Sequence, residues 1–308
     1  MASILITGGA GFIGSNIAEE LHMRHSITVL DNFSTGKRAN MLKSTGIKYV
    51  EGDICDARIV RRALKGVQYV LHLAAIPSVP RSLKHPLETD RVNTAGTLNL
   101  LVESARSEVD RFVYASSSSV YGESKTIQKC ESMTPEPISP YAVSKLAGEY
   151  YCSVFARNLG LSTVCLRYFN VFGWRQDPNS EYSAVIPKFI STMIRGKQPI
   201  IFGDGKQTRD FTYVKNIVHA NRLVMESKKG NGEVFNIATG KSQSLTRLVS
   251  ILNKLLRTRL KPVYVGTRPG DIEHSLADIE KARETFGYNP KWNFEVGLED
   301  TVQWYMKK

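Results

Sequence analysis

Short apolar runs alternate with longer stretches of helical periodicity through the first half of the chain. The apolar runs predict strands over 4–7, 27–31, 48–50, 67–73, 111–116 and 161–168. The intervening segments at 12–24 and 87–107 carry apolar residues at helical spacing. Because the strands are continuously apolar, helices must cover both faces of the sheet that they form. The pattern therefore predicts an α/β fold built on a Rossmann-type, doubly wound parallel sheet.

The periodicity loosens after the last of these strands, in a loop rich in Gly, Pro, Asn and Asp at 173–180. Later elements are shorter and mixed. One apolar stripe over 245–256 follows Ser244, a residue suited to cap a helix. We predict a first domain over 1–168 and a smaller, mixed α/β domain over 169–308, some segments of which return to the first.

A glycine-rich loop lies between the first predicted strand and the first predicted helix. Gly8, Gly11 and Gly14 leave room for a pyrophosphate at the helix N-terminus, where backbone N–H groups and the helix dipole favour an anion. Glycines alone are equally typical of a tight turn. Asp31 ends the next strand, where its carboxylate can accept hydrogen bonds from both ribose hydroxyls. Since that carboxylate would repel a 2′-phosphate, the pattern predicts NAD rather than NADP.

A predicted helix after the Pro-rich loop at 135–140 carries Tyr141 and Lys145, four residues apart on one face. A tyrosine is a poor base at neutral pH, because its ordinary pKa is about 10. A lysine ammonium a few ångströms away, helped by an oxidised nicotinamide, is expected to favour the phenolate and lower that pKa. A hydroxyl from the serine run at 116–119, which closes a strand, can bond the reacting oxygen.

In combination these motifs resemble the extended short-chain dehydrogenase/reductase family, and within it the nucleotide-sugar 4-epimerases. The resemblance covers nearly the whole chain. It is carried by TGGAGFIG (7–14), DNFSTGK (31–37), GDICD (52–56), HLAA (72–75), ASSSSVYG (115–122), PYAVSK (140–145), LRYFNVFGWRQDP (166–178), GDGKQTRDF (203–211) and RPGD (268–271). It implies that the first domain binds NAD tightly and that the second binds a UDP-sugar.

The resemblance also implies the site residues. Ser117, Tyr141 and Lys145 are the expected catalytic residues, with Tyr141 as the base. The expected cofactor-binding residues are Gly8, Gly11, Phe12, Ile13, Gly14, Asp31, Asn32, Ser34, Thr35, Gly36, Asp53, Ile54, Leu73, Ala74, Ala75, Asn93, Ser116, Tyr141, Lys145 and Tyr168. Of these, Asp53 and Ile54 fit an adenine site, although a simple turn explains them almost as well. The expected substrate-binding residues are Ser78, Ser117, Ser118, Tyr141, Asn170, Ala184, Val185, Lys188, Arg209, Arg268, Asp271 and Ser275.

The implied reaction is redox-neutral. Tyr141 takes the proton of the sugar 4-hydroxyl while carbon 4 gives hydride to NAD, the 4-keto sugar turns over in the pocket, and hydride returns to its other face. Related 4,6-dehydratases place an Asp-Glu pair after the catalytic hydroxyl, and UDP-uronate decarboxylases keep a Glu there. Ser118 and Ser119 occupy those positions in this chain, which argues against both reactions and favours epimerisation.

The choice of sugar depends on bulk at one wall of the sugar pocket. In the 4-epimerases a tyrosine a few residues after RPGD excludes a 2-acetamido group, and a small residue admits it. Counting from Asp271, this position is Ser275. Residues 167–189 and Ser78 also resemble epimerases of N-acetylated sugars. We therefore expect interconversion of UDP-N-acetylglucosamine and UDP-N-acetylgalactosamine, with UDP-glucose and UDP-galactose as further substrates.

Two other functions stay open. A UDP-uronate or UDP-N-acetylhexosaminuronate 4-epimerase shares the serine run, and Arg81, Lys84 or Ser78 would then receive the sugar carboxylate. A non-catalytic NAD-binding sensor is the weaker alternative, because such proteins usually lose the tyrosine or the lysine, and this chain keeps both.

Composition narrows the class of partner. A hydrophobic fraction of 42% excludes a disordered chain, and 41 Lys and Arg against 29 Asp and Glu give a formal net charge of +12, which favours an anionic partner. A UDP-sugar explains part of that charge, and without an RNA-binding aromatic motif no nucleic acid is expected. The four cysteines form no C-x-x-C pair, and neither a leader pattern nor an apolar span is present. We predict a cytoplasmic protein with no membrane contact and no metal site. Its relatives imply a homodimer packed through the helices at 87–107 and 140–159.

Overall fold

The computed structural model describes residues 1–124, 126–178, 184–266 and 274–307. Its central sheet has seven strands in the order β12-β7-β5-β4-β1-β2-β3, and every neighbouring pair is parallel. The strands are β1 (Ser3–Thr7), β2 (Ser26–Asp31), β3 (Ile47–Glu51), β4 (Tyr69–His72), β5 (Arg111–Ser117), β7 (Thr163–Tyr168) and β12 (Glu233–Ile237). The predicted parallel sheet is confirmed, with the ends of all six predicted strands within two residues of the observed ones.

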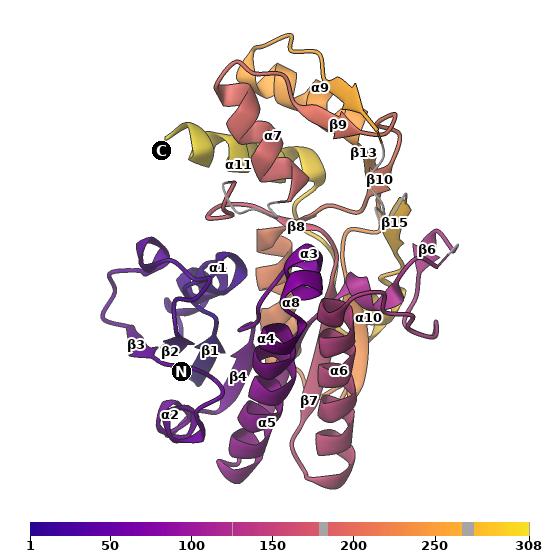
Figure 1. The fold of residues 1–308 in the computed structure, drawn as a ribbon. Coiled ribbons are helices and arrows are strands. Elements are labelled where there is room, and N and C mark those ends of the chain that lie inside the picture. Colours follow the sequence, from indigo (N-terminus) through magenta and orange to yellow (C-terminus); the bar gives the residue numbers. More distant parts are fainter. Residues whose placement is uncertain (125, 179–183, 267–273, 308) are drawn as a thin grey trace.

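Helices cover both faces of this sheet (Figure 1). On one face lie α1 (Phe12–Leu21), α8 (Val214–Glu226) and α10 (Glu280–Phe286), and on the other lie α2 (Ala57–Ala63), α5 (Gly96–Arg106) and α6 (Pro140–Asn158). Successive residues of one strand enter opposite cores because side chains alternate across a strand. In β1, Ile4 and Ile6 pack on the α1 side, whereas Leu5 packs on the other side. The two covered faces explain why the strands carry no polar alternation.

The first predicted helix is two to three residues too long. α1 ends at Leu21 rather than near Arg24. The N–H groups of Arg24 and His25 donate to the Leu21 carbonyl at 3.1 and 3.0 Å, and this turn leads directly into β2. The chain must reverse here to place β2 beside β1, and this reversal ends the helix. The apolar periodicity of the sequence does not show where that reversal begins.

The predicted helix over 87–107 is interrupted. After α3 (Val79–Lys84), α4 (Pro86–Asp90) passes through a π-turn over Arg91–Ala95 into α5. Within that stretch the Thr97 hydroxyl donates to the Asn93 carbonyl at 2.6 Å. Such turns re-aim side chains and are common near functional sites.

Most of the elements after β7 gather at the carboxyl ends of the sheet strands, above the sheet in Figure 1. Helices α7 (Val185–Ile194), α9 (Leu245–Leu256) and α11 (Phe294–Met306) share an apolar core there. The predicted cap of α9 is confirmed, since the Ser244 hydroxyl accepts from the Arg247 N–H at 3.2 Å. Short strands accompany these helices: β6 (Gln128–Lys129), β8 (Val171–Phe172), β9 (Ile200–Phe202), β10 (Thr208–Arg209), β11 (Thr212–Tyr213), β13 (Gln243–Ser244), β14 (Val263–Val265) and β15 (His274–Ala277).

One strand of the central sheet comes from beyond residue 168, the predicted domain boundary. β12 lies at the sheet edge and pairs with β7 along its whole length, from Glu233 beside Val164 to Ile237 beside Tyr168. α8 also packs on the sheet although it follows residue 168. The division of the chain into two domains at residue 168 stays a prediction. The central sheet contains strands from both sides of that boundary.

The structure also bears on the cysteines, on membrane-spanning helices and on metal sites. Cys55, Cys130, Cys152 and Cys165 are all free thiols. Among the described residues, no helix is both long and apolar enough to cross a bilayer. In the same part of the chain, His, Cys, Asp and Glu side chains nowhere form a group of three that could hold a metal ion.

Candidate active site

The loop after β1 forms a cradle at the N-terminus of α1. Gly8 has φ +69°, and a Cβ there would lie 2.8 Å from the Ala74 nitrogen; a Cβ on Gly14 would lie 2.3 Å from the Gly8 carbonyl oxygen. Only glycine fits both positions. Within α1, which is described completely, Gly11 caps the helix without a side-chain hydrogen bond and the first turn carries no acidic residue. The N–H groups of that turn are therefore available to an anion.

Asp31 ends β2 beside this cradle. Its Oδ2 accepts from the Ala10 N–H at 2.9 Å, and its Oδ1 accepts from the Phe33 N–H at 2.8 Å. Phe33 has φ +57°, an uncommon conformation for a residue other than glycine. A Cβ on Gly36 would lie 2.8 Å from Oδ1, so this glycine makes the space that the carboxylate occupies. Each carboxylate oxygen keeps a lone pair for a further donor such as a ribose hydroxyl.

The next arginine along the chain is engaged elsewhere. Arg38 contacts both carboxylate oxygens of Glu51, at 2.8 and 2.7 Å, and its guanidinium lies 4.1 Å from the centre of the Phe33 ring. A 2′-phosphate on the ribose would meet the carboxylate of Asp31 without a free guanidinium to bind it. The donor and acceptor set of the cradle thus fits NAD.

A cleft of about 1020 Å³ runs from the cradle to the start of α6. Most of the predicted cofactor residues line it: Gly8, Gly11, Phe12, Ile13, Gly14, Asp31, Asn32, Ser34, Thr35, Asp53, Ile54, Leu73, Ala74, Ala75, Ser116, Tyr141, Lys145 and Tyr168. The two that do not are Gly36, which packs against Asp31, and Asn93. The buried Asn93 amide bonds the N–H and carbonyl of Ile76 and donates to the Ser144 hydroxyl at 3.1 Å. Asn93 therefore ties the loop after β4 to α6 and does not face the cleft.

The end of β5 and the first turns of α6 bring the predicted catalytic residues together. The Tyr141 hydroxyl is hydrogen-bonded to Ser117. Lys145, one turn further along α6, has its Nζ 6.0 Å from the centre of the Tyr141 ring and donates to the Ala115 carbonyl at 2.8 Å. A hydroxyl pair and an ammonium thus meet at one end of the cleft.

Burial is the largest influence on the pKa values of Tyr141 and Lys145. Burial raises the pKa of Tyr141, and the hydrogen bond with Ser117 opposes the rise. Burial also lowers the pKa of Lys145 to about 8, and the charge of Glu149 opposes that change. Among the protein's own groups, desolvation therefore outweighs the hydrogen bond that lowers the Tyr141 pKa. The expected lowering of the Tyr141 pKa by Lys145 together with the positive charge of an oxidised nicotinamide stays a prediction.

A buried ion pair that the sequence did not reveal lies behind the catalytic residues. Glu149, one turn after Lys145, accepts from Arg167 of β7 through both carboxylate oxygens, at 2.9 and 2.7 Å. The Ser116 hydroxyl donates to the same carboxylate at 2.5 Å. Arg167 also lies over the Tyr121 ring, 4.6 Å from its centre. The only available sequence signal is the position of Glu149 four residues after Lys145, which places it on the same helix face.

His72 of the HLAA motif has a structural role. Its Nδ1 bonds the Thr7 hydroxyl at 2.7 Å and its Nε2 bonds the Thr97 hydroxyl at 2.8 Å. Burial lowers its pKa to about 3, so the ring is neutral at physiological pH. It links β1 and β4 to α5 beneath the cleft.

On the sugar side, three predicted residues that are distant in sequence lie together. Arg209 of β10 is the register partner of Ser275 in β15, and the Asn170 amide donates to the Ser275 hydroxyl at 3.3 Å. Asn170 also donates to the Asp210 carbonyl at 3.1 Å and has φ +34°. Strain of this kind clusters at functional sites.

Of the predicted substrate residues not yet placed, two line the cleft. Ser78 and Ala184 line it, and Ser78 caps α3 in a strained conformation with φ +122°. Val185 and Lys188 lie in the first turn of α7, which Ala184 caps. Ser118 begins the short 3₁₀ turn after β5. Arg268 and Asp271 lie outside the described residues.

An anion cradle and a buried Tyr–Lys pair that face one cleft place the protein in the short-chain dehydrogenase/reductase class. Comparison with known proteins narrows this class. The model of the NAD dependent epimerase/dehydratase family matches residues 4–238. The chain belongs to this family, and its cofactor is NAD.

Solved structures of relatives share the whole architecture. A UDP-N-acetylglucosamine 4-epimerase from Methanobrevibacter ruminantium, in complex with UDP-N-acetylmuramic acid, is 42% identical with a TM-score of 0.96, over 99% of this chain and 98% of that one. A UDP-glucose 4-epimerase from Thermotoga maritima with UDP-glucose is 39% identical with a TM-score of 0.94, over 99% of both chains. In sequence, the UDP-glucose 4-epimerase of Mycolicibacterium smegmatis is 33% identical over 310 residues, 99% of this chain and 98% of the relative.

The Asp31 geometry predicts a loss of NAD affinity in Asp31→Asn. An amide keeps the shape but exchanges one acceptor oxygen for a donor and removes the charge, which costs about 1.5–3 kcal/mol for a hydrogen bond to a charged group, or roughly a 10- to 100-fold weaker Kd. Calorimetric titration of the NAD-free protein measures this change. The exposed Glu51, the register partner of Asp31 on β3, supplies the control: Glu51→Gln should bind NAD as the wild type does. Equal affinity of Asp31→Asn and the wild type would contradict the ribose role.

The Glu149 geometry predicts a shift of the pH profile. In Glu149→Gln the carboxylate that raises the Lys145 pKa is lost, so that pKa falls further below about 8. Lys145 then loses its proton at lower pH, and the alkaline limb of kcat moves down by roughly 1 pH unit. Glu103→Gln is the matched control, because Glu103 is a buried, arginine-paired carboxylate on α5. Variants are compared at equal NAD content and at temperatures below each Tm; an unmoved limb in Glu149→Gln would exclude this role.

Proposed function

We propose that this protein, an NAD-dependent isomerase that inverts carbon 4 of UDP-sugars, interconverts UDP-N-acetylglucosamine and UDP-N-acetylgalactosamine and also accepts UDP-glucose and UDP-galactose. The observation that carries the choice of sugar is the small, buried side chain of Ser275, which lies beside Asn170 and Arg209. A hydroxymethyl group is smaller than the tyrosine that excludes a 2-acetamido group in other 4-epimerases, so we expect this wall to admit that group. The UDP-N-acetylglucosamine 4-epimerase of M. ruminantium, at 42% identity, supports the same choice.

The catalytic residues act on the 4-hydroxyl of the sugar. The cleft residues would hold NAD, which when bound would supply the hydride acceptor and donor for carbon 4. Tyr141, as phenolate, removes the hydroxyl proton and returns it at the end. Ser117, whose side chain is hydrogen-bonded to Tyr141, also hydrogen-bonds the sugar 4-oxygen and holds that oxygen next to the Tyr141 phenol. Lys145 keeps a positive charge near the ring, which favours the phenolate. Buried Glu149 supports that charge.

The residues after Ser117 supply no group for dehydration or decarboxylation. Ser118 and Ser119 lie in the 3₁₀ turn, and neither hydroxyl is an acid or a base near neutral pH. The Ser119 hydroxyl is buried and finds no hydrogen-bond partner among the described residues. Proton transfer at carbons 5 or 6 would need a carboxylate here, so the turn restricts the chemistry to carbon 4.

A uronate substrate is the second candidate, because relatives of this kind are also close. UDP-glucuronate 4-epimerase 1 of Arabidopsis thaliana is 34% identical over 333 residues. A carboxylate at carbon 6 needs a cation to receive it. Arg81 lines the cleft, but its guanidinium donates to the Glu88 carboxylate at 3.0 Å. The pairing occupies Arg81, whereas Lys84 and Ser78, the other two predicted receivers, also line the cleft. The uronate therefore stays the second candidate.

The exposed face of α6 supports a homodimer. Val143, Tyr150 and Val154 repeat on one side of this helix and are about half exposed, at 52%, 60% and 49%. Leu87 of α4 is 85% exposed. A second copy that packs on α6 would cover these side chains, as the resemblance to dimeric relatives implies.

The Ser275 proposal predicts a separation of two activities. Ser275→Tyr fills the wall of the sugar pocket, so turnover of UDP-N-acetylglucosamine should fall by at least 100-fold, whereas turnover of UDP-glucose should change by less than about fivefold. Purified protein is incubated with each UDP-sugar and with the two uronic acids, without added oxidant, and NMR identifies the products. Ser275→Ala, which keeps the wall small, should retain both activities. Equal loss of both in Ser275→Tyr would defeat the pocket-wall idea, and wild-type turnover of the uronates alone would establish the second candidate.

The α6 proposal predicts that Tyr150→Glu is a monomer. A charge inside an apolar helix interface is desolvated without a partner, which weakens association strongly. Light scattering coupled to size exclusion should give half the wild-type mass. Ile200→Glu places the same charge on an exposed apolar residue of β9 and should leave the mass unchanged. A wild-type monomer, or an unaltered mass in Tyr150→Glu, would refute the interface.

A further inference from the structure

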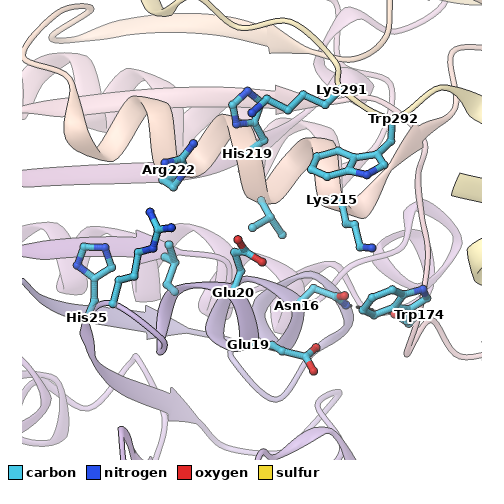
Figure 2. A pocket seen from close by; sticks show the side chains of 13 residues that line it. Asn16, Glu19, Glu20, His25, Trp174, Lys215, His219, Arg222, Lys291 and Trp292 are labelled. Carbon is cyan, nitrogen blue, oxygen red and sulfur yellow. Dashed lines mark hydrogen bonds between the residues drawn. The ribbon is translucent and has the colours of Figure 1, made fainter. Parts of the chain in front are cut away.

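A second cavity lies on the α1 side of the sheet, separate from the residues of the NAD cleft. Its volume is about 490 Å³, and we name it the α1–α8 pocket after the two helices that form most of it. Figure 2 shows the side chains that point into it. Its lining residues are Asn16, Glu19, Glu20, Leu21, Arg24, His25, Trp174, Lys215, Val218, His219, Arg222, Lys291 and Trp292. None of the catalytic residues faces it.

One end of the pocket is basic. Arg24 follows α1, Arg222 lies on α8, and Lys291 precedes α11. In the part of the chain that the structure describes, no carboxylate forms an ion pair with any of these three. Burial and the charges of Lys291 and Arg222 lower the pKa of His219 to about 4, in agreement with a positive potential at this end.

The carboxylates near the pocket offset only part of this charge. Glu19 pairs with Arg175 at 2.7 Å, and Lys215 pairs with Asp300 at 3.0 Å. Glu20 points into the pocket (Figure 2), and Glu226 lies close enough to His25 to raise its pKa against the effect of burial. Three unpaired cations against one unpaired carboxylate in the lining leave an excess of positive charge, which attracts an anion with more than one charge.

The other end of the pocket is aromatic. Trp174 and Trp292 both line it, with Lys215 4.7 Å from the centre of one ring and 6.0 Å from the centre of the other (Figure 2). On α8, residues 215, 219 and 222 lie on one face, and seven residues of helix span roughly 10 Å. The basic end and the tryptophans are therefore separated by about the length of one nucleotide, in a cavity of the size that small ligands occupy.

We propose that the α1–α8 pocket is a second ligand site, which binds a nucleoside phosphate. The phosphate lies among Arg24, Arg222 and Lys291, and the planar base lies against Trp174 and Trp292. Arginine suits the phosphate because its fork of N–H donors bonds two oxygens at once. Tryptophan suits the base because both are flat and polarisable. This site accounts for part of the positive charge that the UDP-sugar leaves unexplained.

Titration calorimetry with AMP at low salt tests the proposal. The NAD-loaded protein is first saturated with UDP, so that the sugar-nucleotide site is filled. We expect one AMP per chain. Arg222→Glu or Lys291→Glu should weaken this binding by at least tenfold, because each replaces attraction by repulsion. Trp292→Ala should weaken it about threefold or more. All three should retain wild-type epimerase activity, since none of these side chains faces the NAD cleft. Trp292 also packs against the apolar core of α7, α9 and α11, so Trp292→Ala is titrated below its own, lower Tm.

Lys254→Glu controls for general charge, because Lys254 is exposed on α9 away from the pocket. It should bind AMP as the wild type does. Absence of AMP binding to the wild type, equal loss in Lys254→Glu, or unchanged binding in Arg222→Glu would each overturn the site. Inorganic phosphate is titrated in parallel. Phosphate binding as tight as that of AMP, with no effect of Trp292→Ala, would overturn the nucleoside part of the proposal.

Discussion

The buried ion pair between Glu149 and Arg167 is the interaction on which the position of the catalytic helix depends. Both side chains are almost completely buried, and the carboxylate also accepts from Ser116. One group thus joins α6, β5 and β7 directly behind Lys145. Removal of one partner from a buried pair typically destabilises a protein by about 3–5 kcal/mol, because the other charge is left uncompensated. The pair therefore fixes where Tyr141 and Lys145 stand relative to the serine run. Its carboxylate also opposes the lowering of the Lys145 pKa by burial.

The two ends of the active site are built in different ways. The cofactor end is local, since the cradle, Asp31 and the loop after β4 each follow one strand of the parallel sheet, and the carboxyl ends of those strands meet at one edge. The proposed sugar-binding end is assembled from distant segments. Asn170, Arg209 and Ser275 meet through two-residue strand pairings and one side-chain hydrogen bond. A wall made in this way can change its bulk without disturbing the cofactor site.

This difference also explains what the sequence could predict. Strands with both faces buried are uniformly apolar, so the parallel sheet could be predicted from the alternation of apolar runs with helical periodicity. Gly8, Gly14, Asp31 and the Tyr141–Lys145 spacing were recognisable because each requirement is met within a short segment. The interruption of the helix at 91–95, the inward turn of Asn93 and the pairing of Glu149 with Arg167 depend on contacts between distant segments. The direction of the Tyr141 pKa depends on how much water is excluded, which residue spacing does not encode.

The late position of β12 in the chain has a consequence for synthesis. The ribosome releases β7 well before β12, and until β12 arrives, the edge of β7 presents unpaired N–H and C=O groups to the solvent. A nascent chain that stops near residue 168 therefore carries an open, apolar sheet edge, to which another nascent chain can pair. We therefore expect the NAD-binding domain to complete its folding only after β12 has been synthesised. NAD binding and assembly of the proposed sugar site would then occur together, late in translation.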